Sequence, residues 1–395
     1  GVNLSGNTNN GAINISSALR GGTNYIAGIV GYTSSSKTTT PALISNCTNK
    51  GAISVTSSSI AELSVAGIVA YAVGTQAENS HNYGALSVGS QENPTLVIGR
   101  INMAGFAVRF TDGAVDSKIV NVSNNAPITL WTAEGSYCEG YSVVGIIRWS
   151  QGDSTTVTNS AEGDITVNGS YALNNASVSE NNISGLFGYK TSNSGKECTN
   201  RGDITVNTTF TTHSSLKDKA QVFNIGGLAG RTHQVVAGTN YGTITLNSDT
   251  SGLLYKTNVQ VGGCLGAGDG SEKNNINRGT ININGKHSRL YIGGAIGYSE
   301  GKHTDAENYG AINISGEISG VPCIGGIAGY SKGNVADSEN HGTITVDSEY
   351  TFPGSVYMSG ITPYVAAIGR CYNYGNLEFK GSSASDSAIL TGVTF

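Results

Sequence analysis

The sequence predicts an all-β protein, a single-stranded right-handed β-helix (a β-solenoid) of about eleven three-strand coils, running as one continuous array over residues 1–395. A glycine-punctuated unit recurs almost end to end: ten intervals separate Gly11 from Gly375, a mean spacing of about 36 residues. Apolar residues within each unit occupy every second position, which is the period of a β-strand. Repetition combined with strand periodicity is typical of a solenoid.

Composition supports strands over helices. Charged residues make up 12% of the chain, and 56 of its 395 residues are glycine. Abundant Ile, Val, Thr, Ser, Asn and Gly favour strands and tight turns, whereas few charges and few Leu, Lys and Glu argue against helices.

The first element of the unit is Asn-x-Gly-x-Ile/Leu-x-apolar. It occupies residues 9–15, 49–55, 82–88, 200–206, 240–246, 277–283, 308–314, 340–346 and 373–379, with degenerate copies at 124–130 and 161–167. We expect the Asn side chain to bond the backbone of a corner or its counterpart in the next coil, and the Gly to serve a corner of positive φ or close backbone approach.

The second element is apolar-(Gly/Ala/Ser)-Gly-apolar-x-Gly-Tyr. It ends at Tyr32, Tyr71, Tyr189, Tyr298 and Tyr330, and looser copies end at Phe110, Trp149, Arg231, Ala267 and Tyr364. A third short strand fits between this element and the next Asn, so each coil has three strands, stacked ~4.8 Å from the next. A propeller is the alternative architecture, but the last intervals, about 32 residues each, barely hold the four strands of a blade.

Three insertions, at residues 89–101, 169–181 and 208–219, lengthen the middle coils. We expect them to leave one corner of adjacent coils and to build a surface patch, where solenoids usually place binding function. An uncapped coil exposes strand edges and core. We therefore expect further domains or repeats of a longer polypeptide, or a docked partner, to cover one or both ends.

Charge and cysteine placement exclude some classes of partner. The net charge of −5 is spread along the chain without a run of Lys or Arg, which predicts no nucleic-acid partner. No apolar stretch approaches the eighteen residues of a membrane span. Cys47, Cys198 and Cys371 fall on one wall several coils apart, so we predict free, inward-facing thiols.

The most regular copies are IGGAIGYSEGKHTDAENYGAINI at residues 292–314 and IGGIAGYSKGNVADSENHGTITV at residues 324–346. This unit resembles the GLUG-type repeat of bacterial cell-surface proteins. The resemblance implies a secreted or surface-attached repeat protein within a larger adhesin-like or protease-associated architecture, and it implies no catalytic residues. Copies between residues 82 and 167 depart from the pattern, with Arg109, Pro127 and Arg148 in place of small residues.

Two columns of side chains are candidate binding surfaces. The first holds Tyr32, Tyr71, Phe110, Trp149, Tyr189, Tyr298, Tyr330 and Tyr364. Stacked rings suit sugar faces or a protein partner, but a structural stack that shields a corner explains this column as well. The second, at the x of Asn-x-Gly, alternates aromatic and basic groups, and a solvated turn is its plainer explanation. It begins at Lys50, and its candidate ligand-binding residues are Tyr83, Arg201, Tyr241, Arg278, Tyr309, His341 and Tyr374.

Carboxylate chemistry is the main enzyme alternative. Asp164 and Asp203 occupy one repeat position in successive coils, so we expect them ~5 Å apart, as in a retaining glycosidase or a Ca²⁺ site. Other coils carry Ala or Thr there, so a solvated pair is the plainer interpretation. The Gly-Asp turn at residues 266–270 is similar to a Ca²⁺-binding turn, but it occurs once and the nonapeptide repeat is missing. The Arg-Gly-Asp at residues 201–203 is explained by the repeat, which places a variable residue on each side of that Gly. We predict no cofactor, no catalytic residues and no metal beyond this weak pair.

The sequence therefore predicts an extracellular, non-enzymatic module, adhesin-like or a spacer, for a glycan or protein ligand on a host or neighbouring cell. One alternative is a carbohydrate-active β-helix enzyme, either a polysaccharide lyase or a glycoside hydrolase, which needs several titratable groups in one cleft. Another is a purely structural stalk without a ligand.

Overall fold

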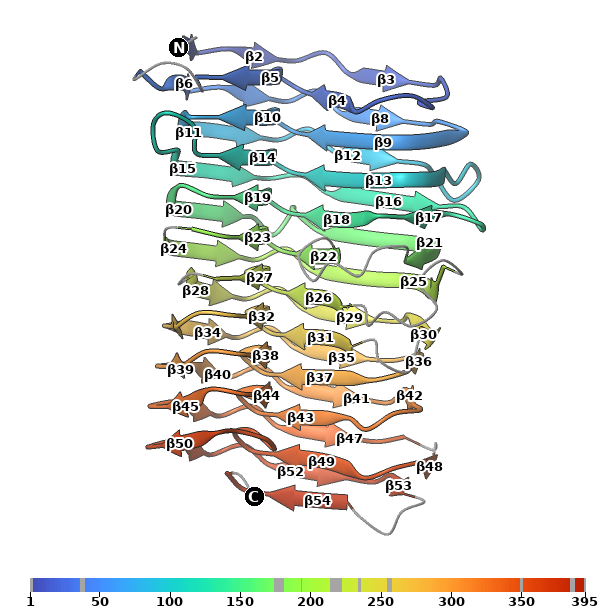
Figure 1. The fold of residues 1–395 in the computed structure, drawn as a ribbon, viewed down its shortest axis with the longest axis vertical. Coiled ribbons are helices and arrows are strands. Elements are labelled where there is room, and N and C mark those ends of the chain that lie inside the picture. Colours follow the sequence, from blue (N-terminus) through green and yellow to red (C-terminus); the bar gives the residue numbers. More distant parts are fainter. Residues whose placement is uncertain are drawn as a thin grey trace.

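The computed structural model is an all-β parallel solenoid (Figure 1). It describes residues 3–35, 40–173, 181–192, 194–213, 222–233, 236–253, 258–348, 351–383 and 388–393. Every strand pair within these residues is parallel and joins successive turns, which excludes the antiparallel blades of a propeller. The two termini lie at opposite ends of the stack.

Four long sheets, A to D, run along the stack. On its main path, sheet A contains β1 (Asn3–Ser5), β6 (Ala42–Ser45), β11 (Thr75–Asn82), β15 (Lys118–Asn124), β20 (Asp153–Asn159), β24 (Gly195–Asn200), β28 (Val236–Asn240), β34 (Asn275–Asn277), β40 (Glu307–Asn308), β46 (Glu339–Asn340) and β51 (Tyr372–Asn373), with β2 (Thr8–Asn9) and β7 (Thr48–Asn49) beside it. Sheet D contains β5 (Val30–Ser34), β10 (Val69–Val73), β14 (Ala107–Thr111), β19 (Ile147–Ser150), β23 (Phe187–Lys190), β27 (Ala229–Thr232), β32 (Leu265–Gly268), β38 (Ile296–Ser299) and β44 (Ala328–Ser331).

Sheets B and C form the other half of each turn. Sheet B contains β3 (Ile13–Ile15), β8 (Ile53–Val55), β12 (Leu86–Val88), β16 (Ile128–Thr132), β21 (Ile165–Leu173), β25 (Ile204–Thr212), β29 (Ile244–Leu246), β35 (Ile281–Ile283), β41 (Ile312–Ile314), β47 (Ile344–Val346) and β52 (Leu377–Phe379), with β17 (Tyr137–Cys138), β30 (Asp249–Gly252), β36 (Lys286–His287) and β42 (Glu317–Ile318) beside them. Sheet C contains β4 (Asn24–Ala27), β9 (Ser59–Ala66), β13 (Leu96–Ala104), β18 (Gly140–Val144), β22 (Asn181–Ser184), β26 (Val222–Gly226), β31 (Asn258–Gly262), β37 (Leu290–Gly293), β43 (Cys323–Gly325), β49 (Val356–Ser359) and β54 (Ala388–Thr391).

Two short sheets close the corners of the later turns. One contains β33 (Glu272–Lys273), β39 (His303–Thr304), β45 (Asn334–Ala336) and β50 (Ala367–Gly369), and the other contains β48 (Thr351–Phe352) and β53 (Ser382–Ser383).

The solenoid has about nine complete turns, each with a strand in all four long sheets. The paths of sheets A, B and C pass through eleven strands, as the eleven sequence repeats predict, and sheet D has nine strands within the described residues. Each complete turn has four main strands, whereas the sequence predicted three. The second element splits into two strands, such as β4 and β5, because the chain bends at its central glycine. The right-handed sense of the coil stays a prediction.

Two hydrophobic cores lie on either side of a narrow waist. Sheets B and C enclose one core, and sheets A and D enclose the other. Eleven asparagines, one per turn, form a ladder at the waist between them: Asn9, Asn49, Asn82, Asn124, Asn159, Asn200, Asn240, Asn277, Asn308, Asn340 and Asn373. Each Nδ2 donates to the next Asn Oδ1 at 2.7–2.9 Å. From Asn49 on, Nδ2 also donates to a carbonyl of its own corner, so both predicted partners are confirmed.

Glycines are required where the backbones of the waist meet. A Cβ atom on Gly242 would overlap the carbonyl oxygen of Gly202 in the preceding turn, and one on Gly227 would overlap the carbonyl of Gly263 and the amide of Asn240. The close approach of neighbouring backbones therefore explains the glycines in both elements of the repeat.

All six cysteines are free, as predicted for the three that share a wall. Cys47 and Cys198 are buried in the core between sheets A and D, and Cys371 is half-buried against it. No helix in the part of the chain that the structure describes is long and apolar enough to cross a membrane.

The described parts of two insertions extend strands of sheet B, whereas the third insertion includes an exposed loop at residues 91–94. The predicted surface patch stays a prediction. Strands β21 and β25 pair over nine residues each and carry the start of two insertions, at residues 169–173 and 208–212. Tyr171 and Phe210 on these extensions are buried against Tyr141 and Phe223. Residues 169–173 and 208–212 therefore widen the core between sheets B and C. Residues 174–180 and 214–219 lie outside the described part of the chain.

Candidate functional site

The predicted aromatic and basic column lies on the outer surface of the bend between sheets A and B. We call Arg201, Tyr241, Arg278, Tyr309, His341 and Tyr374 the A/B stripe. Each of them follows a ladder asparagine directly, so its side chain points outward where the asparagine points inward. The stripe tyrosines are 40–61% exposed. Tyr83 is exposed on the same bend, but Asn125 and Ser160 take the position in the intervening turns, so it stands apart from the stripe.

Neighbouring members of the stripe stack on one another in two segments. The Arg201 Cζ lies 4.5 Å from the Tyr241 ring centroid, and the Arg278 Cζ lies 4.4 Å from that of Tyr309. The Tyr309 and His341 rings lie 4.6 Å apart with an interplanar angle of 4°, and the His341 and Tyr374 rings lie 4.8 Å apart at 17°. The sequence pattern thus located an exposed and ordered array.

This stacking determines how the stripe can meet a ligand. Because most ring faces cover one another, a ligand would meet mainly the ring edges, hydroxyl groups and guanidinium N–H groups. Some edge groups already have partners: the Tyr309 hydroxyl donates to Glu307 Oε2 at 2.8 Å, which raises the pKa of Tyr309, and His341 Nε2 lies 3.1 Å from Glu339 Oε2. The stripe is therefore suited to polar recognition from the side and less to stacking on a sugar face.

The other predicted column lies on the outer surface of sheet D and differs from the prediction at one residue. The strand register pairs Tyr71 with Arg109 and Arg109 with Trp149, so Phe110 does not belong to the column. Phe110 is buried in the core between sheets A and D. The prediction was wrong because this copy has the regular length and ends at Arg109, and the aromatic residue that follows it was taken as the column member. Arg109 instead bridges the Tyr71 and Trp149 rings, with its Cζ 5.1 and 5.3 Å from their centroids.

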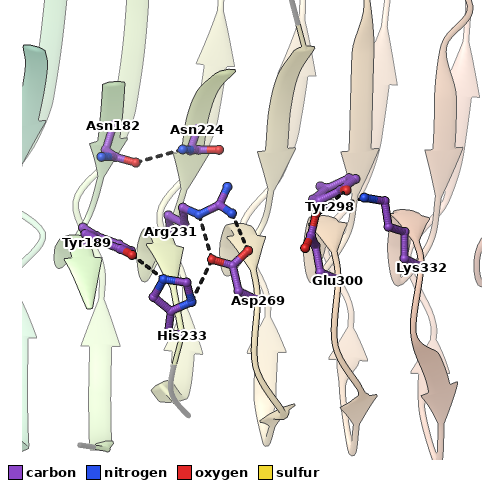
Figure 2. Close-up of polar contacts among 9 residues, drawn as sticks. All are labelled: Asn182, Tyr189, Asn224, Arg231, His233, Asp269, Tyr298, Glu300 and Lys332. Atoms are coloured by element: carbon purple, nitrogen blue, oxygen red, sulfur yellow. Dashed lines mark hydrogen bonds and ion pairs between the residues drawn. The ribbon is translucent and has the colours of Figure 1, made fainter. Parts of the chain in front are cut away.

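A polar cluster interrupts this column in the middle of the molecule (Figure 2). Arg231 occupies a column position, and its Nε donates to Asp269 Oδ2 at 2.8 Å while its second N–H group bonds Asp269 Oδ1. His233 Nδ1 lies 2.8 Å from the same Asp269 Oδ2, and the Tyr189 hydroxyl bonds His233 Nε2. The small Ala267 aligns with Arg231 in the next turn. These groups form a continuous Tyr–His–Asp–Arg chain over three turns.

The Tyr189–His233–Asp269 order is that of a general-base relay, in which a carboxylate orients a histidine that polarises a hydroxyl group. Its carboxylate is also engaged by Arg231, and the Arg231 and Asp269 side chains are only 8% and 10% exposed. Burial raises the pKa of the Tyr189 hydroxyl, so this group holds its proton more tightly than an exposed tyrosine. Sequence reasoning missed the cluster. Its signal was two neighbouring departures from the aromatic column, Arg231 and Ala267.

Lys190, beside Tyr189, is fully buried and already bound by oxygen atoms. Its Nζ donates to the carbonyls of Gln151 at 3.0 Å, Gly152 at 2.5 Å and Ser192 at 3.2 Å, and to Ser150 Oγ at 3.3 Å. Burial lowers the pKa of Lys190 to about 8. The ammonium group ties the backbone of neighbouring turns and does not face the Tyr–His–Asp–Arg chain as a base.

Asp164 and Asp203 are neighbours, as predicted, and bind backbone. Asp164 Oδ1 accepts from the Asp203 N–H at 2.8 Å, and Asp203 Oδ1 accepts from the Thr243 N–H at 2.7 Å. Each carboxylate thus binds a backbone N–H group of the next turn. Among the described residues, no three or more His, Cys, Asp or Glu side chains gather as a metal ion would require.

Comparison with protein-family models, with curated proteins and with solved structures gives no match to this chain.

Proposed function

We propose that this chain is an adhesin-like binding or spacer module of a secreted or surface-attached bacterial protein, and that the A/B stripe contacts a glycan or protein ligand. The observation that carries the proposal is an exposed array of Arg, Tyr and His side chains that stacks in two segments over six turns, from Arg201 to Tyr374. The GLUG-like repeats at residues 292–346 support an extracellular location and further domains in the same polypeptide.

The fold supports this proposal through rigidity. The asparagine ladder and the two cores fix the spacing of the turns, so the stacked side chains of the stripe are already ordered before a ligand arrives. Prior ordering reduces the entropy that association costs, about 0.5–1.5 kcal/mol per immobilised side chain. A stiff rod also suits a spacer that holds a binding surface away from a cell.

The test is a glycan-array and host-matrix binding screen with the wild type and with a variant carrying Tyr241→Ala, Tyr309→Ala and Tyr374→Ala. We expect the wild type to bind and the triple variant to lose at least tenfold in affinity, because the substitution removes the ring edges and their hydroxyls. A matched variant with Phe at the same three positions keeps the rings and should show an intermediate loss. Equal binding by all three proteins would contradict a role for the stripe, and binding by none would favour a stalk.

One observation favours a second candidate, a carbohydrate-active enzyme: the Tyr189–His233–Asp269 relay described above. In such an enzyme the Tyr189 oxygen would take or give the proton at the sugar ring. The test is depolymerisation of a panel of neutral and acidic polysaccharides by the wild type and by Tyr189→Phe, which keeps the ring and removes the hydroxyl group. Activity that Tyr189→Phe abolishes would support the enzyme, and absence of activity in the wild type would contradict it.

A further inference from the structure

Two adjoining hollows lie beside sheet C in the later turns, away from the A/B stripe. One, of about 270 Å³, is lined by Arg289, Val321, Cys323, Tyr330, Tyr357, Pro363 and Tyr364. The other, of about 190 Å³, is lined by Ser288, Arg289, Ser319, Gly320, Val321, Pro353 and Gly354. Arg289 and Val321 belong to both. Each hollow is smaller than the roughly 300–1,000 Å³ of a drug-sized site, so each suits one ring-sized group.

The Arg289 guanidinium stands at the junction of the hollows without an anionic partner. Its Cζ lies 5.3 Å from the ring centroid of Tyr291, a contact that orients the group. Its Nε is buried and has no hydrogen-bond partner, and no carboxylate among the described residues pairs with it. By contrast, Arg231 and Arg370 each form a two-bond pair with an aspartate. A planar, oriented and unpaired guanidinium is the group that binds a carboxylate in two-bond geometry.

The walls of the two hollows differ in character. Tyr330 and Tyr364 stack at 4.4 Å with an interplanar angle of 9°, and Tyr364 is 52% exposed. Aromatic rings pack against the apolar face of a pyranose. The smaller hollow is lined by Ser288, a residue that is 93% buried and whose Oγ has no hydrogen-bond partner among the described residues. An unpartnered buried hydroxyl at the wall of a hollow is a site for a polar group of a ligand.

From this arrangement we propose that the paired hollows bind two consecutive sugars of an acidic oligosaccharide. The carboxylate of one sugar pairs with Arg289, its ring packs against Tyr364, and a hydroxyl group of the next sugar bonds Ser288 Oγ. The site does not use the A/B stripe and is separate from it.

The repeat explains why the site occurs in these turns. Arg289 aligns with Asn258 in the preceding turn and with Val321 in the following one. The shorter Val321 side chain leaves space beside the guanidinium. Departures from the repeat, and not its regular positions, therefore create the hollows.

The experiment is isothermal titration calorimetry of the whole chain with three acidic probes: tetragalacturonate, a hyaluronan tetrasaccharide and sialyllactose. Neutral analogues are the methyl-esterified galacturonate, the carboxyl-reduced hyaluronan fragment and lactose. We expect at least one acidic probe to bind tenfold or more tightly than its neutral analogue. Arg289→Met keeps the apolar stem against Tyr291 and should lower the affinity for that acidic probe at least tenfold. Arg289→Lys should lower this affinity less.

Arg278→Met is the matched control, because it removes one guanidinium from the A/B stripe. The proposal is supported if Arg278→Met binds the acidic probe as the wild type does while Arg289→Met binds it more weakly. It is overturned if no acidic probe binds the wild type, if acidic and neutral probes bind equally, or if Arg289→Met binds as the wild type does. A loss of affinity in Arg278→Met but not in Arg289→Met would also overturn the proposal, and it would indicate that the acidic probe binds the A/B stripe.

Discussion

Two columns of side chains run side by side through this solenoid, one residue apart in sequence, and differ in almost every physical respect. The asparagine ladder is buried for most of its length and keeps the same residue in eleven turns, whereas the A/B stripe is exposed and alternates Arg, Tyr and His. An internal amide must both accept from one turn and donate to the next, a requirement that Asn meets and that an exposed position does not impose. A residue type that recurs in every turn therefore shows only that the position is equivalent from turn to turn. Whether the column stabilises the fold depends on whether its side chains are buried.

The largest effect should follow from adding a methyl group where the backbones of the waist meet. Gly242→Ala places a Cβ against the carbonyl of Gly202, so the turns must separate, at a cost of about 3 kcal/mol or more in the free energy of unfolding. Urea denaturation measures this cost. Gly11→Ala is the matched control in the same column, because its Cβ would have only an ordinary contact at 3.8 Å. Equal losses in both variants would mean that the close approach is not what requires glycine.

A slightly smaller effect should follow from breaking the ladder itself. Asn240→Leu removes the bonds from Asn200 at 2.8 Å and to Asn277 and the Gly242 carbonyl at 2.9 Å each. Asn200 Nδ2 keeps its bond to the Gly202 carbonyl, and Asn277 Oδ1 keeps its bond from the Gly279 N–H. A buried group left without a partner costs about 1–3 kcal/mol, so we expect a loss of about 2–3 kcal/mol. Tyr241→Leu, one residue along the chain, tests the comparison directly. If Tyr241→Leu lowers the free energy of unfolding as much as Asn240→Leu does, the two columns contribute equally to stability.

Much of this architecture could be predicted from the sequence, because each element has a local cause. Strand periodicity located sheet B, as at Ile281 and Ile283, and the recurring Asn and Gly located the waist. The four-strand turn was missed because the bend at glycines such as Gly28 depends on Asn49 across the waist, which is a contact between distant residues. Sequence spacing alone does not show such a contact.

The candidate sites were predicted only where they repeat. The A/B stripe was located because it recurs, but stacking of its ring faces, as between Tyr309 and His341, is a property of the assembled turns. The Asp269 cluster and the Arg289 hollows arise from single departures whose partners come from other turns. Register errors of one residue, as at Phe110, also exchange an inward and an outward side chain.

A third prediction concerns an interior column where the repeat breaks down. Glu272 and His303 pair in register inside the core between sheets A and D, where both are fully buried. Burial, aided by the charge of Asp269, raises the pKa of Glu272 well above its usual value, and burial lowers the pKa of His303 to about 4. Both side chains are therefore neutral in the fold near neutral pH.

The sign of the pH effect follows from Glu272. Above the ordinary carboxyl pKa the unfolded chain loses this proton while the folded chain keeps it, so stability falls with rising pH by about 1.4 kcal/mol per pH unit until the folded pKa is reached. Glu272→Gln should remove this loss and be more stable than the wild type at pH 8, but not at pH 4. Urea denaturation at both pH values measures the difference. Glu317→Gln, at an exposed carboxylate, should show no such gain, and a gain in both variants would contradict burial as the cause.

The smallest effect on stability should come from the stripe. Tyr309→Ala unstacks Arg278 and His341, but exposed cation–ring contacts contribute only about 0.5–1 kcal/mol, so the free energy of unfolding should fall by no more than about 1 kcal/mol. Tyr309→Phe keeps both stacks, loses the bond to Glu307 and should lie within about 0.5 kcal/mol of the wild type. If Tyr309→Ala instead lowers the free energy of unfolding as much as Asn240→Leu does, the stacked rings stabilise the contacts between turns. The stripe would then be a second structural ladder, and its exposure would no longer argue for a ligand.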